Sequence, residues 1–370
     1  FRAMVAALTA KDKGVISGAG EISLVAHRVV HGGERFTEAT LVTDEVLEAL
    51  DALSPLAPLH NPVNVAGIRE LRLLLPAVPQ VAVFDTAFHH TLPAYAYLYG
   101  LPYELYETKG VRRYGFHGMS HAYVSLRAAQ FLGRRPNELE LVSCHLGNGS
   151  SLCAIDHGRS VDTTMGFTPA EGLIMGTRCG DVDAGVLAFL ERTEGLTASQ
   201  SEEMLNKKSG LLGMSGISSD MREILQAADA GEPRALLALK AYCYRVRKYL
   251  GGYIAAMGGL DAVVFTGGVG QGSDMVRALA LQGLGGMGIR LDDERNRNAR
   301  GFDEVCRLST DDSPVAVLVI TRLLQGAAGA LTRIQIAHKD VQMSAGLPTT
   351  CASRMLANFV APYDAHVVAG

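Results

Sequence analysis

Two arginines, one aspartate and one histidine stand where catalytic groups are often placed, at the ends of apolar stretches or inside glycine-containing loops. Arg28 lies in "VAHRVVHGG", Asp85 ends "VAVFD", His117 lies in "YGFHGMS" and Arg178 lies in "IMGTRCGD". Taken singly, an arginine in a strand is more often an edge residue, and a lone histidine is more often structural. Together they suit phosphoryl transfer, which needs positive groups around the moving phosphoryl and little covalent chemistry from the protein.

Two glycine-rich loops follow apolar stretches, "HLGNGSS" and "FTGGVGQGSD". Small residues let the backbone approach a ligand, and clustered backbone N–H groups favour anions. The second loop leads into a helix, whose N-terminus adds a positive dipole end. Each loop alone is equally consistent with a hairpin turn or an ordinary strand-to-helix connection. Neither matches GxxxxGK[ST] or a well-placed GxGxxG, which disfavours a standard P-loop ATPase and a Rossmann dehydrogenase.

Length and composition limit the class of protein. The chain has 370 residues, 48% of them hydrophobic, and a net charge of -4, so two lobes are expected and a basic nucleic-acid binder is not. The sequence has no apolar run long enough for a transmembrane helix. Its six cysteines form no CxxC pair, which favours reduced core cysteines and a cytoplasmic location. The first residues lack the pattern of a secretory signal.

The first part of the chain alternates between apolar strand patterns and helical periodicity, which is typical of an α/β fold. Thr43 is a predicted helix N-cap. The expected elements are a strand over 22–33, a helix over 43–53, a proline-punctuated loop over 54–64, a helix over 66–75 and a buried strand over 80–85.

The rest of the chain predicts a second set of elements. Asp220 and Glu223 match a capping box, and Gly231 and Pro233 close the helix that it begins. The other expectations are a polar loop over 108–118, a helix over 120–132, a three-stranded meander over 141–165, a helix over 235–257, a strand, glycine loop and helix over 261–279, and a strand over 313–320. Residues 321–370 show no clear period and predict a weak helix followed by a poorly ordered end.

Six motifs in this order resemble the acetate kinase family. They are "VAHRVVHGGERF", "APLHNPVNVAGI", "VFDTAFHHTLP", "YGFHGMSHAYV", "CHLGNGSSLCAIDHGRSVDTTMGFTPAEGLIMGTRCGDVD" and "VFTGGVGQGSDMVR". The resemblance runs from Val25 to Ile320. It implies an α/β fold of two ribonuclease-H-like (actin-like ATPase) lobes around a nucleotide cleft. Residues 1–86 would be an incomplete first lobe, 87–320 the second lobe with the ATP-binding loops, and 321–370 a divergent tail.

The resemblance implies a reversible, direct in-line phosphoryl transfer from ATP to acetate, with Mg²⁺, giving acetyl phosphate and ADP. Asp85, His117 and Arg178 would be catalytic, and Arg28 would bind the acetate carboxylate or the acyl phosphate. Substrate contacts would come from Val30, His60, Phe116 and Pro169, with Leu59 in the same apolar pocket. ATP would contact His145, Leu146, Gly147, Asn148, Gly149, Asp220, Met221, Arg222, Gly268, Val269, Gly270, Gln271 and Gly272.

The sequence departs from the family pattern at three places. The chain begins after the family's opening "N-x-G-S-S-S-x-K" loop, which supplies a lysine near the ATP phosphates and an asparagine at the metal. After Ile320 the expected glutamate pair, which helps to hold Mg²⁺, is replaced by "TRLLQGAAGAL". The usual "GIGEN" loop reads "GVGQG". Both usual protein ligands of Mg²⁺ are therefore missing, and the first lobe is expected to expose a new sheet edge.

Three functions stay open from the sequence. The first is acetate kinase and the second is propionate kinase, because one methylene is worth only ~1–3 kcal/mol of discrimination in an apolar pocket. The third is a catalytically impaired remnant that only binds nucleotide. The family resemblance also implies a homodimer formed through the second lobe.

Overall fold

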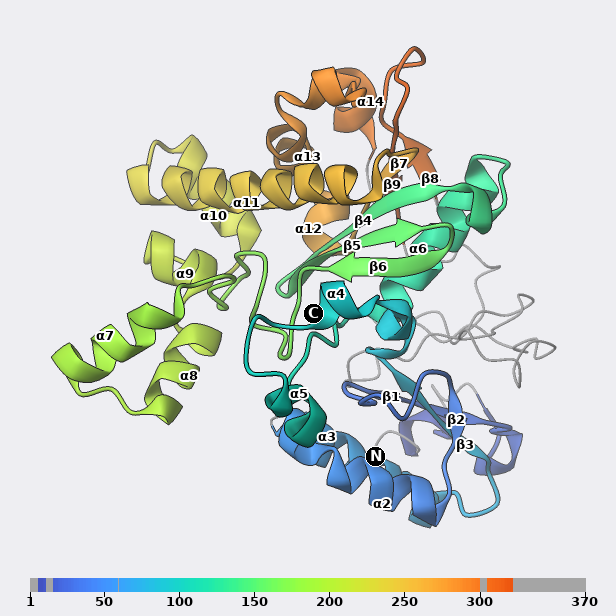
Figure 1. The fold of residues 1–370 in the computed structure, drawn as a ribbon. Helices are drawn as coiled ribbons and strands as arrows, with labels where there is room; N and C mark the ends of the chain where they lie inside the picture. The colour runs from blue at the N-terminus through green and yellow to red at the C-terminus, as the bar shows by residue number, and fades with distance from the viewer. Residues whose placement is uncertain (1–5, 11–15, 59, 300–304, 322–370) are drawn as a thin grey trace. The chain divides into compact units, whose positions relative to one another are not determined.

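The computed structural model describes residues 6–10, 16–58, 60–299 and 305–321 of the chain. These residues fall into two compact units, a first unit within residues 1–90 and a second unit within residues 91–322. Figure 1 labels the helices and strands of both units. The divergent tail expected at 321–370 lies outside the described residues, except for Thr321. No helix in the described part of the chain has the length and apolar character needed to cross a membrane.

The first unit is built on a small mixed sheet with the strand order β1-β3-β2. β1 (Val25–Val29) pairs in parallel with β3 (Gln80–Phe84), and β2 (Thr40–Leu41) pairs with β3 in the antiparallel direction. Among the described residues β1 pairs with β3 alone. The predicted strands over 22–33 and 80–85 are confirmed, although β1 is shorter than its predicted range.

Two helices cover this sheet, and their starts follow from local chemistry. α2 (Asp44–Ala52) begins after Thr43, whose hydroxyl accepts the backbone N–H of Val46, as the sequence predicts. α3 (Asn61–Leu74) begins five residues before its predicted start, because a proline in the first helical turn needs no hydrogen-bond partner. The predicted proline-punctuated loop over 54–64 is therefore wrong. That segment contains a 3₁₀ turn, η2 (Ser54–Leu56), and the first turn of α3.

The core of the first unit lies between the sheet and these helices. Leu50, Val65, Ile68 and Ala82 are fully buried in it. The rings of Phe36 and Phe84 stack with their centroids 4.9 Å apart. This core fixes the strand ends on which Arg28 and Asp85 are carried.

The second unit contains a six-stranded sheet with the order β6-β5-β4-β7-β9-β8. Its strands are β4 (Glu140–Leu146), β5 (Ser150–Asp156), β6 (Arg159–Thr163), β7 (Ala262–Thr266), β8 (Val305–Arg307) and β9 (Ala316–Ile320). β4, β5 and β6 form the predicted antiparallel meander, while β4, β7 and β9 run parallel. The α/β class is thereby confirmed.

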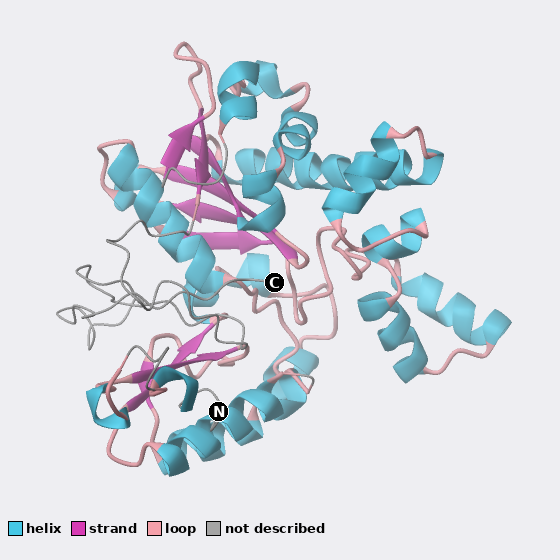
Figure 2. Ribbon diagram, turned by 180° about the vertical axis from the view of Figure 1, so that it is seen from behind, coloured by secondary structure: helices cyan, strands magenta, loops and turns pink. Residues whose placement is uncertain are grey.

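Opposite faces of this sheet are covered by different helices (Figure 2). Alternate residues of β4 show the division, because successive side chains in a strand point to opposite faces. Val142, Cys144 and Leu146 pack in the core with α11 (Pro233–Met257). Ser143 and His145 point to the other face, where they contact α6 (Gly118–Phe131). The sheet thus has one apolar face and one face with polar contacts.

Several other elements differ from the sequence predictions. Asp220 caps α10 (Met221–Asp229), but the predicted capping box with Glu223 is wrong, because the backbone N–H of Asp220 donates to Ser218 instead. The predicted glycine loop after β7 is a short helix, α12 (Gly267–Gly272). Residues 183–215, for which the sequence indicated no element, form three helices. The remaining helices are α4 (Ala94–Tyr97), α5 (Glu104–Lys109), α7 (Ala184–Glu194), α8 (Ala198–Lys207), α9 (Gly210–Ser215), α13 (Asp274–Leu281) and α14 (Asp293–Asn298).

A buried arginine joins three of these helices. Arg277 of α13 donates to the backbone oxygens of Gly270 and Gln271 at the end of α12, and to the side-chain and backbone oxygens of Asn296 in α14. Its side chain is 1% exposed, and burial lowers its pKa to about 10. Arg277 therefore satisfies carbonyl groups that the ends of two short helices would otherwise leave unpaired.

We expect Arg277→Met to reduce the free energy of unfolding by at least ~2 kcal/mol, because it leaves several buried acceptors without a donor. Chemical denaturation monitored by circular dichroism measures this loss. Arg297→Met is the matched control, since Arg297 is an exposed arginine of α14, and it should change the stability little. Equal effects of the two substitutions would contradict the proposed anchoring role of Arg277.

Candidate active site

In the first unit, Arg28 and Asp85 form a bidentate ion pair. Nε of Arg28 lies 2.7 Å from Oδ1 of Asp85, and Nη2 lies 2.5 Å from Oδ2. Arg28 is in β1 and Asp85 directly follows β3, so the parallel pairing of the two strands brings them together. The Asp85 side chain is 2% exposed. The structure thus unites two predicted site residues and shows that each orients the other.

The start of α3 is attached to the end of β1. Asn64 accepts the backbone N–H of Val30 through its side chain, while Asn61 both accepts from and donates to the backbone of His31. His60 is the N-cap residue of α3 and therefore directly precedes this contact. The "HNPVN" motif accordingly holds Val30 and His60 in one local structure. Leu59, predicted to lie in the same apolar pocket, lies outside the described residues.

In the second unit, the two glycine-rich segments lie at one edge of the sheet. β4 and β7 are parallel neighbours, so the segments that follow them, residues 145–149 and α12, leave the sheet at the same end. A Cβ placed on Gly267 would lie 2.6 Å from the carbonyl oxygen of Leu146, and one on Gly270 would lie 3.6 Å from the Cβ of Leu146. The two segments are therefore packed against each other through glycines, as their predicted shared role in ATP binding requires.

The 145–149 segment is also attached to the segment that carries Arg178. The backbone N–H of Gly176 donates to the carbonyl oxygen of Asn148. A Cβ on Gly176 would lie 1.9 Å from Oδ1 of Asn148 and 3.0 Å from the carbonyl oxygen of Ser219. Gly176 is thus a point of close approach for three parts of the chain, including the residue before Asp220.

Arg178 is a partly buried cation with no carboxylate partner in the described part of the chain. Its side chain donates to the carbonyl oxygen of Pro169 at 3.3 Å and contacts Sδ of Met175 at 3.8 Å. Within the described residues it makes no ion pair, and burial lowers its pKa. A desolvated guanidinium whose charge no neighbouring carboxylate balances is suited to bind an anion such as a phosphate.

His117 precedes α6 in a left-handed backbone conformation with φ of 58°. This conformation is uncommon for residues other than glycine and is often found at functional sites. Nδ1 of His117 lies 2.8 Å from Oγ of Ser151, and its ring stacks on that of His145 with the centroids 4.3 Å apart. Nδ1 of His145 in turn lies 2.8 Å from Oγ of Ser120.

Gly149 lies between His117 and Arg178. A Cβ on Gly149 would be 3.3 Å from Nη1 of Arg178 and 3.6 Å from both Cε1 and Nε2 of His117. The structure therefore brings together the catalytic histidine and arginine predicted from the sequence, beside the predicted phosphate loop. Two nitrogen-rich side chains around a glycine backbone form a site suited to a phosphoryl group.

The other predicted site residues of the second unit lie in varied environments. Phe116 and Met221 are buried, Met221 within the apolar core. Arg222 is exposed, and its guanidinium forms an ion pair with Asp220. Gly268 and Gly272 of α12 are exposed, and Gln271 donates from Nε2 to the carbonyl oxygen of Ile320. Their roles toward ATP remain predictions.

Sequence reasoning missed an arginine that organises the backbone near Pro169. Nη1 of Arg113 donates to the carbonyl oxygens of three consecutive residues, Thr163, Thr164 and Met165. Nη2 of Arg113 pairs with Glu171, which also accepts a hydrogen bond from Tyr99. Arg113 stands four residues before His117, but nothing in the spacing of these residues predicts its partners.

The described residues do not supply a magnesium site. Mg²⁺ prefers oxygen ligands, chiefly carboxylates, phosphates and water. Around Gly149 the side chains are imidazole and guanidinium, and Asp85 is paired with Arg28. No group of three or more His, Cys, Asp or Glu that could hold a metal ion occurs among the described residues. Protein-held Mg²⁺ therefore does not fit this part of the chain.

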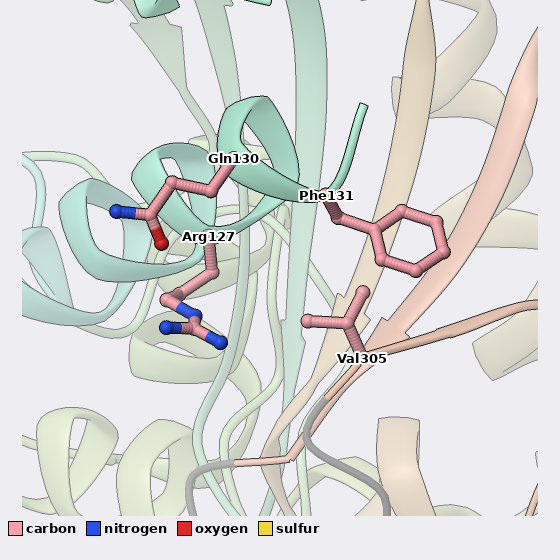
Figure 3. A pocket seen from close by; sticks show the side chains of 4 residues that line it. All are labelled: Arg127, Gln130, Phe131 and Val305. Carbon is pink, nitrogen blue, oxygen red and sulfur yellow. The ribbon is translucent and has the colours of Figure 1, made fainter. Parts of the chain in front are cut away.

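A surface hollow lies away from these residues. Figure 3 shows its lining, which is formed by Arg127, Gln130 and Phe131 of α6 and Val305 of β8. Arg127 is ten residues beyond His117, roughly 15 Å along the helix. The lining carries one cation and no carboxylate, imidazole or glycine loop, so the hollow is not part of the candidate site.

The fold and the site define a class of phosphate-handling α/β proteins, in which glycine segments at strand ends lie beside a histidine and an arginine. Comparison with known proteins agrees with this class.

The family model described as "Acetokinase family" matches residues 2–322. The acetate kinase of Phocaeicola vulgatus is 53% identical over 313 residues, which is 85% of this chain and 78% of that protein. That of Thermoanaerobacter pseudethanolicus is 54% identical over 315 residues, again 85% and 78%.

Solved structures show the same likeness. The crystal structure of Porphyromonas gingivalis acetate kinase matches with a TM-score of 0.83 at 47% identity, covering 86% of this chain and 80% of that one. A propionate kinase from Francisella tularensis matches with a TM-score of 0.78 at 40% identity, covering 82% and 77%. The chain belongs to the acetokinase family. This confirms the family resemblance inferred from the six motifs.

We expect Gly176→Ala to reduce the free energy of unfolding by ~1–3 kcal/mol, because the new methyl group overlaps the side chain of Asn148 and forces a well-packed segment to move. Differential scanning calorimetry measures the change. Gly252→Ala is the control, since Gly252 is an exposed glycine of α11 with nothing within 4 Å of an added Cβ. It should stabilise the protein by ~0.5–1 kcal/mol. A neutral Gly176→Ala variant would contradict the close approach described above.

Proposed function

We propose that this protein is an acetate kinase that transfers a phosphoryl group reversibly between ATP and acetate. The observation that carries the proposal is the Arg178 guanidinium, which has no carboxylate partner within the described residues and lies with His117 beside Gly149. An Asp or Glu side chain paired with Arg178 would have neutralised its charge. Its absence among the described residues leaves the charge to be balanced by a bound phosphate.

In the proposed reaction an oxygen of acetate forms a bond to the γ-phosphorus of ATP while the bond from that phosphorus to the bridging oxygen of ADP breaks. The products are acetyl phosphate and ADP. Negative charge is spread over the three equatorial oxygens of the moving group. Arg178 and His117 would stabilise these oxygens, so no covalent intermediate with the protein is required.

The remaining roles follow the family resemblance and the contacts of each unit. Arg28 would bind the acyl carboxylate or acyl phosphate, and its bidentate pair with Asp85 would fix the orientation of its guanidinium. Asp85 would orient Arg28 in addition to its predicted catalytic role. The 145–149 segment and α12 would contact ATP.

Mg²⁺ would enter as part of the substrate, bound to ATP phosphates and water, because the described residues offer no site for it. We also propose a cytoplasmic location. Five cysteines in the described part of the chain form no disulfide, and three of them, Cys144, Cys153 and Cys243, are buried. Buried cysteines in the thiol form are typical of proteins from reducing compartments.

A propionate kinase is the second candidate, because a propionate kinase is among the similar structures at 40% identity. The two activities differ by one methylene in the acyl pocket. Rates with acetate and propionate at matched concentrations distinguish them, since the better substrate has the higher kcat/KM.

We expect Arg178→Ala to lower kcat by a factor of ~10²–10³, because a donor to the transition-state charge is lost. The measurement is a hydroxamate assay of acyl phosphate formed from acetate, ATP and Mg²⁺. Arg178→Lys should also be strongly impaired, since lysine keeps the charge but not the planar fork.

Arg159→Ala is the control for Arg178→Ala, because Arg159 is an exposed arginine of β6, and its kcat should stay near the wild-type value. Circular dichroism should show the same fold for all three variants. Near-normal turnover by a folded Arg178→Ala variant would refute the assignment.

We further propose that the protein is a homodimer that uses α7 of the second unit. No residue of α7 is buried, and Val182, Val186 and Phe189 expose 43%, 40% and 54% of their surface. In Figure 1, α7 and α8 extend away from the sheet of the second unit. Three apolar side chains on such a protruding segment are suited to contact a second copy, as the family resemblance implies.

We expect Phe189→Glu to convert the dimer to a monomer, because each copy would have to bury an unpaired carboxylate in the proposed contact. Sedimentation velocity measures the mass. Leu73→Glu is the control, since Leu73 is a 79% exposed leucine of α3 in the first unit, and that variant should remain dimeric. Loss of the dimer in both variants, or in neither, would contradict the assignment of α7.

A further inference from the structure

Behind His117, four side chains from three elements form a continuous hydrogen-bonded chain. Nδ1 of His117 lies 2.8 Å from Oγ of Ser151, which lies 2.8 Å from Nε2 of His121. Nδ1 of His121 lies 2.6 Å from Oγ of Ser143. His121, Ser143 and Ser151 are fully buried. His121 lies in the first turn of α6 and His117 is the N-cap residue of that helix, while β4 and β5 supply the serines.

When both imidazole rings are neutral, all the hydrogen bonds in this series of four side chains must be donated in the same direction. A neutral imidazole has one N–H donor and one acceptor nitrogen, and a serine hydroxyl has a single proton. Ser151 can therefore donate to only one histidine and must accept from the other. The proton position on His121 then decides the proton position on His117.

Ser143 at the far end selects the direction. Within the described residues the hydroxyl of Ser143 has a single hydrogen-bond partner, Nδ1 of His121. If His121 donated from Nδ1, the Ser143 proton would be buried without an acceptor, which is more costly than an unused oxygen lone pair. Ser143 therefore donates to Nδ1 of His121. It follows that Nε2 of His121 donates to Ser151, and Ser151 donates to Nδ1 of His117.

This direction leaves the proton of His117 on Nε2. Nε2 is the ring nitrogen near Gly149, where an added Cβ would lie 3.6 Å from it and 3.3 Å from Nη1 of Arg178. An N–H group, rather than a lone pair, thus faces the same side as the arginine. A lone pair there would repel a phosphoryl oxygen, while an N–H would bind it.

We propose that Ser143, His121 and Ser151 are positioning residues that hold His117 in the tautomer protonated at Nε2 and so present a hydrogen-bond donor to the transferring phosphoryl group. The contact with the phosphoryl rests on the proposed function. The tautomer does not, because it follows from the buried hydrogen bonds alone.

The tautomers can be read directly by ¹⁵N NMR of histidine side chains in the full chain, at a pH above the ordinary imidazole range so that the rings are neutral. His117→Gln and His121→Gln variants assign the signals. Protonated Nε2 and unprotonated Nδ1 in both His117 and His121 are expected. Protonation of either residue at Nδ1 would overturn the proposal, whatever the enzymatic activity of the protein.

Kinetics test the consequence for catalysis. Ser151→Ala removes the donor to His117, so a fraction protonated at Nδ1 should appear in the ¹⁵N spectrum, and kcat should fall about tenfold with little change in KM. Ser143→Ala leaves the contact between Ser151 and His117 in place and should cause a smaller change of the same kind. It also keeps the test open if Ser151→Ala fails to fold.

Ser125→Ala is the control, because Ser125 is a buried serine of the same helix whose hydroxyl donates only to the carbonyl oxygen of Ala122. Its tautomers and kcat should match the wild type. A folded Ser151→Ala variant with unchanged kcat and an unchanged His117 spectrum would refute the positioning role. Absence of kinase activity in the wild type would instead refute the proposed function, while the spectra still decide the tautomer.

Discussion

The positive charge of Arg178, which no carboxylate balances among the described residues, is the constraint that the second unit is organised around. A partly buried guanidinium needs a rigid surrounding structure, because the chain would otherwise relax to expose the charge to water. Backbone contacts supply the rigidity. The amide groups of Ser209, Leu211 and Leu212 donate to the carbonyl oxygens of Thr177, Met175 and Gly176, so α9 and the residue before it hold the arginine segment from one side.

A second set of contacts holds the segment that carries Arg178. The carbonyl oxygen of Asn148 accepts the backbone N–H of Gly176, and Arg113 donates to the backbone of residues 163–165. The carboxylate of Glu171 satisfies Arg113 and not Arg178. Glu171 therefore lies close to Arg178 in the sequence, but its carboxylate is paired with Arg113. Among the described residues, Arg113 thus has a carboxylate partner and Arg178, beside Gly149, has none.

Much of the fold could be predicted because it is encoded locally. Thr43 caps its helix, Gly258 ends the long helix in the left-handed conformation, and the meander over 141–165 follows the alternation of its side chains. Predictions failed where a nearby group competed. The hydroxyl of Ser218 accepts the backbone N–H of Asp220, which Glu223 was expected to bind. The glycines after β7 form a short helix, and the side chains of Thr266 and Gln271 beside them donate to the carbonyl oxygen of Ile320 at the end of β9.

The predicted site residues His117, Arg178 and Gly149 belong to motifs whose order along the chain resembles the family pattern, and the structure brings the three together. The residues that orient them could not be predicted, because they depend on strand register. Ser143 and Ser151 are far along the chain from both His117 and His121, so no local spacing links them. They reach His121 only when β4 and β5 pair so that His145 lies across from Ser151. The one local clue was the spacing of His117 and His121, which places both rings on one side of a helix.

The alternation along β4 has a consequence for how such a protein changes over time. Val142, Cys144 and Leu146 belong to the apolar core with α11, whereas Ser143 and His145 form hydrogen bonds with side chains of α6. On the function proposed above, substitutions that change stability and substitutions that change turnover would therefore fall on alternate residues of a single strand.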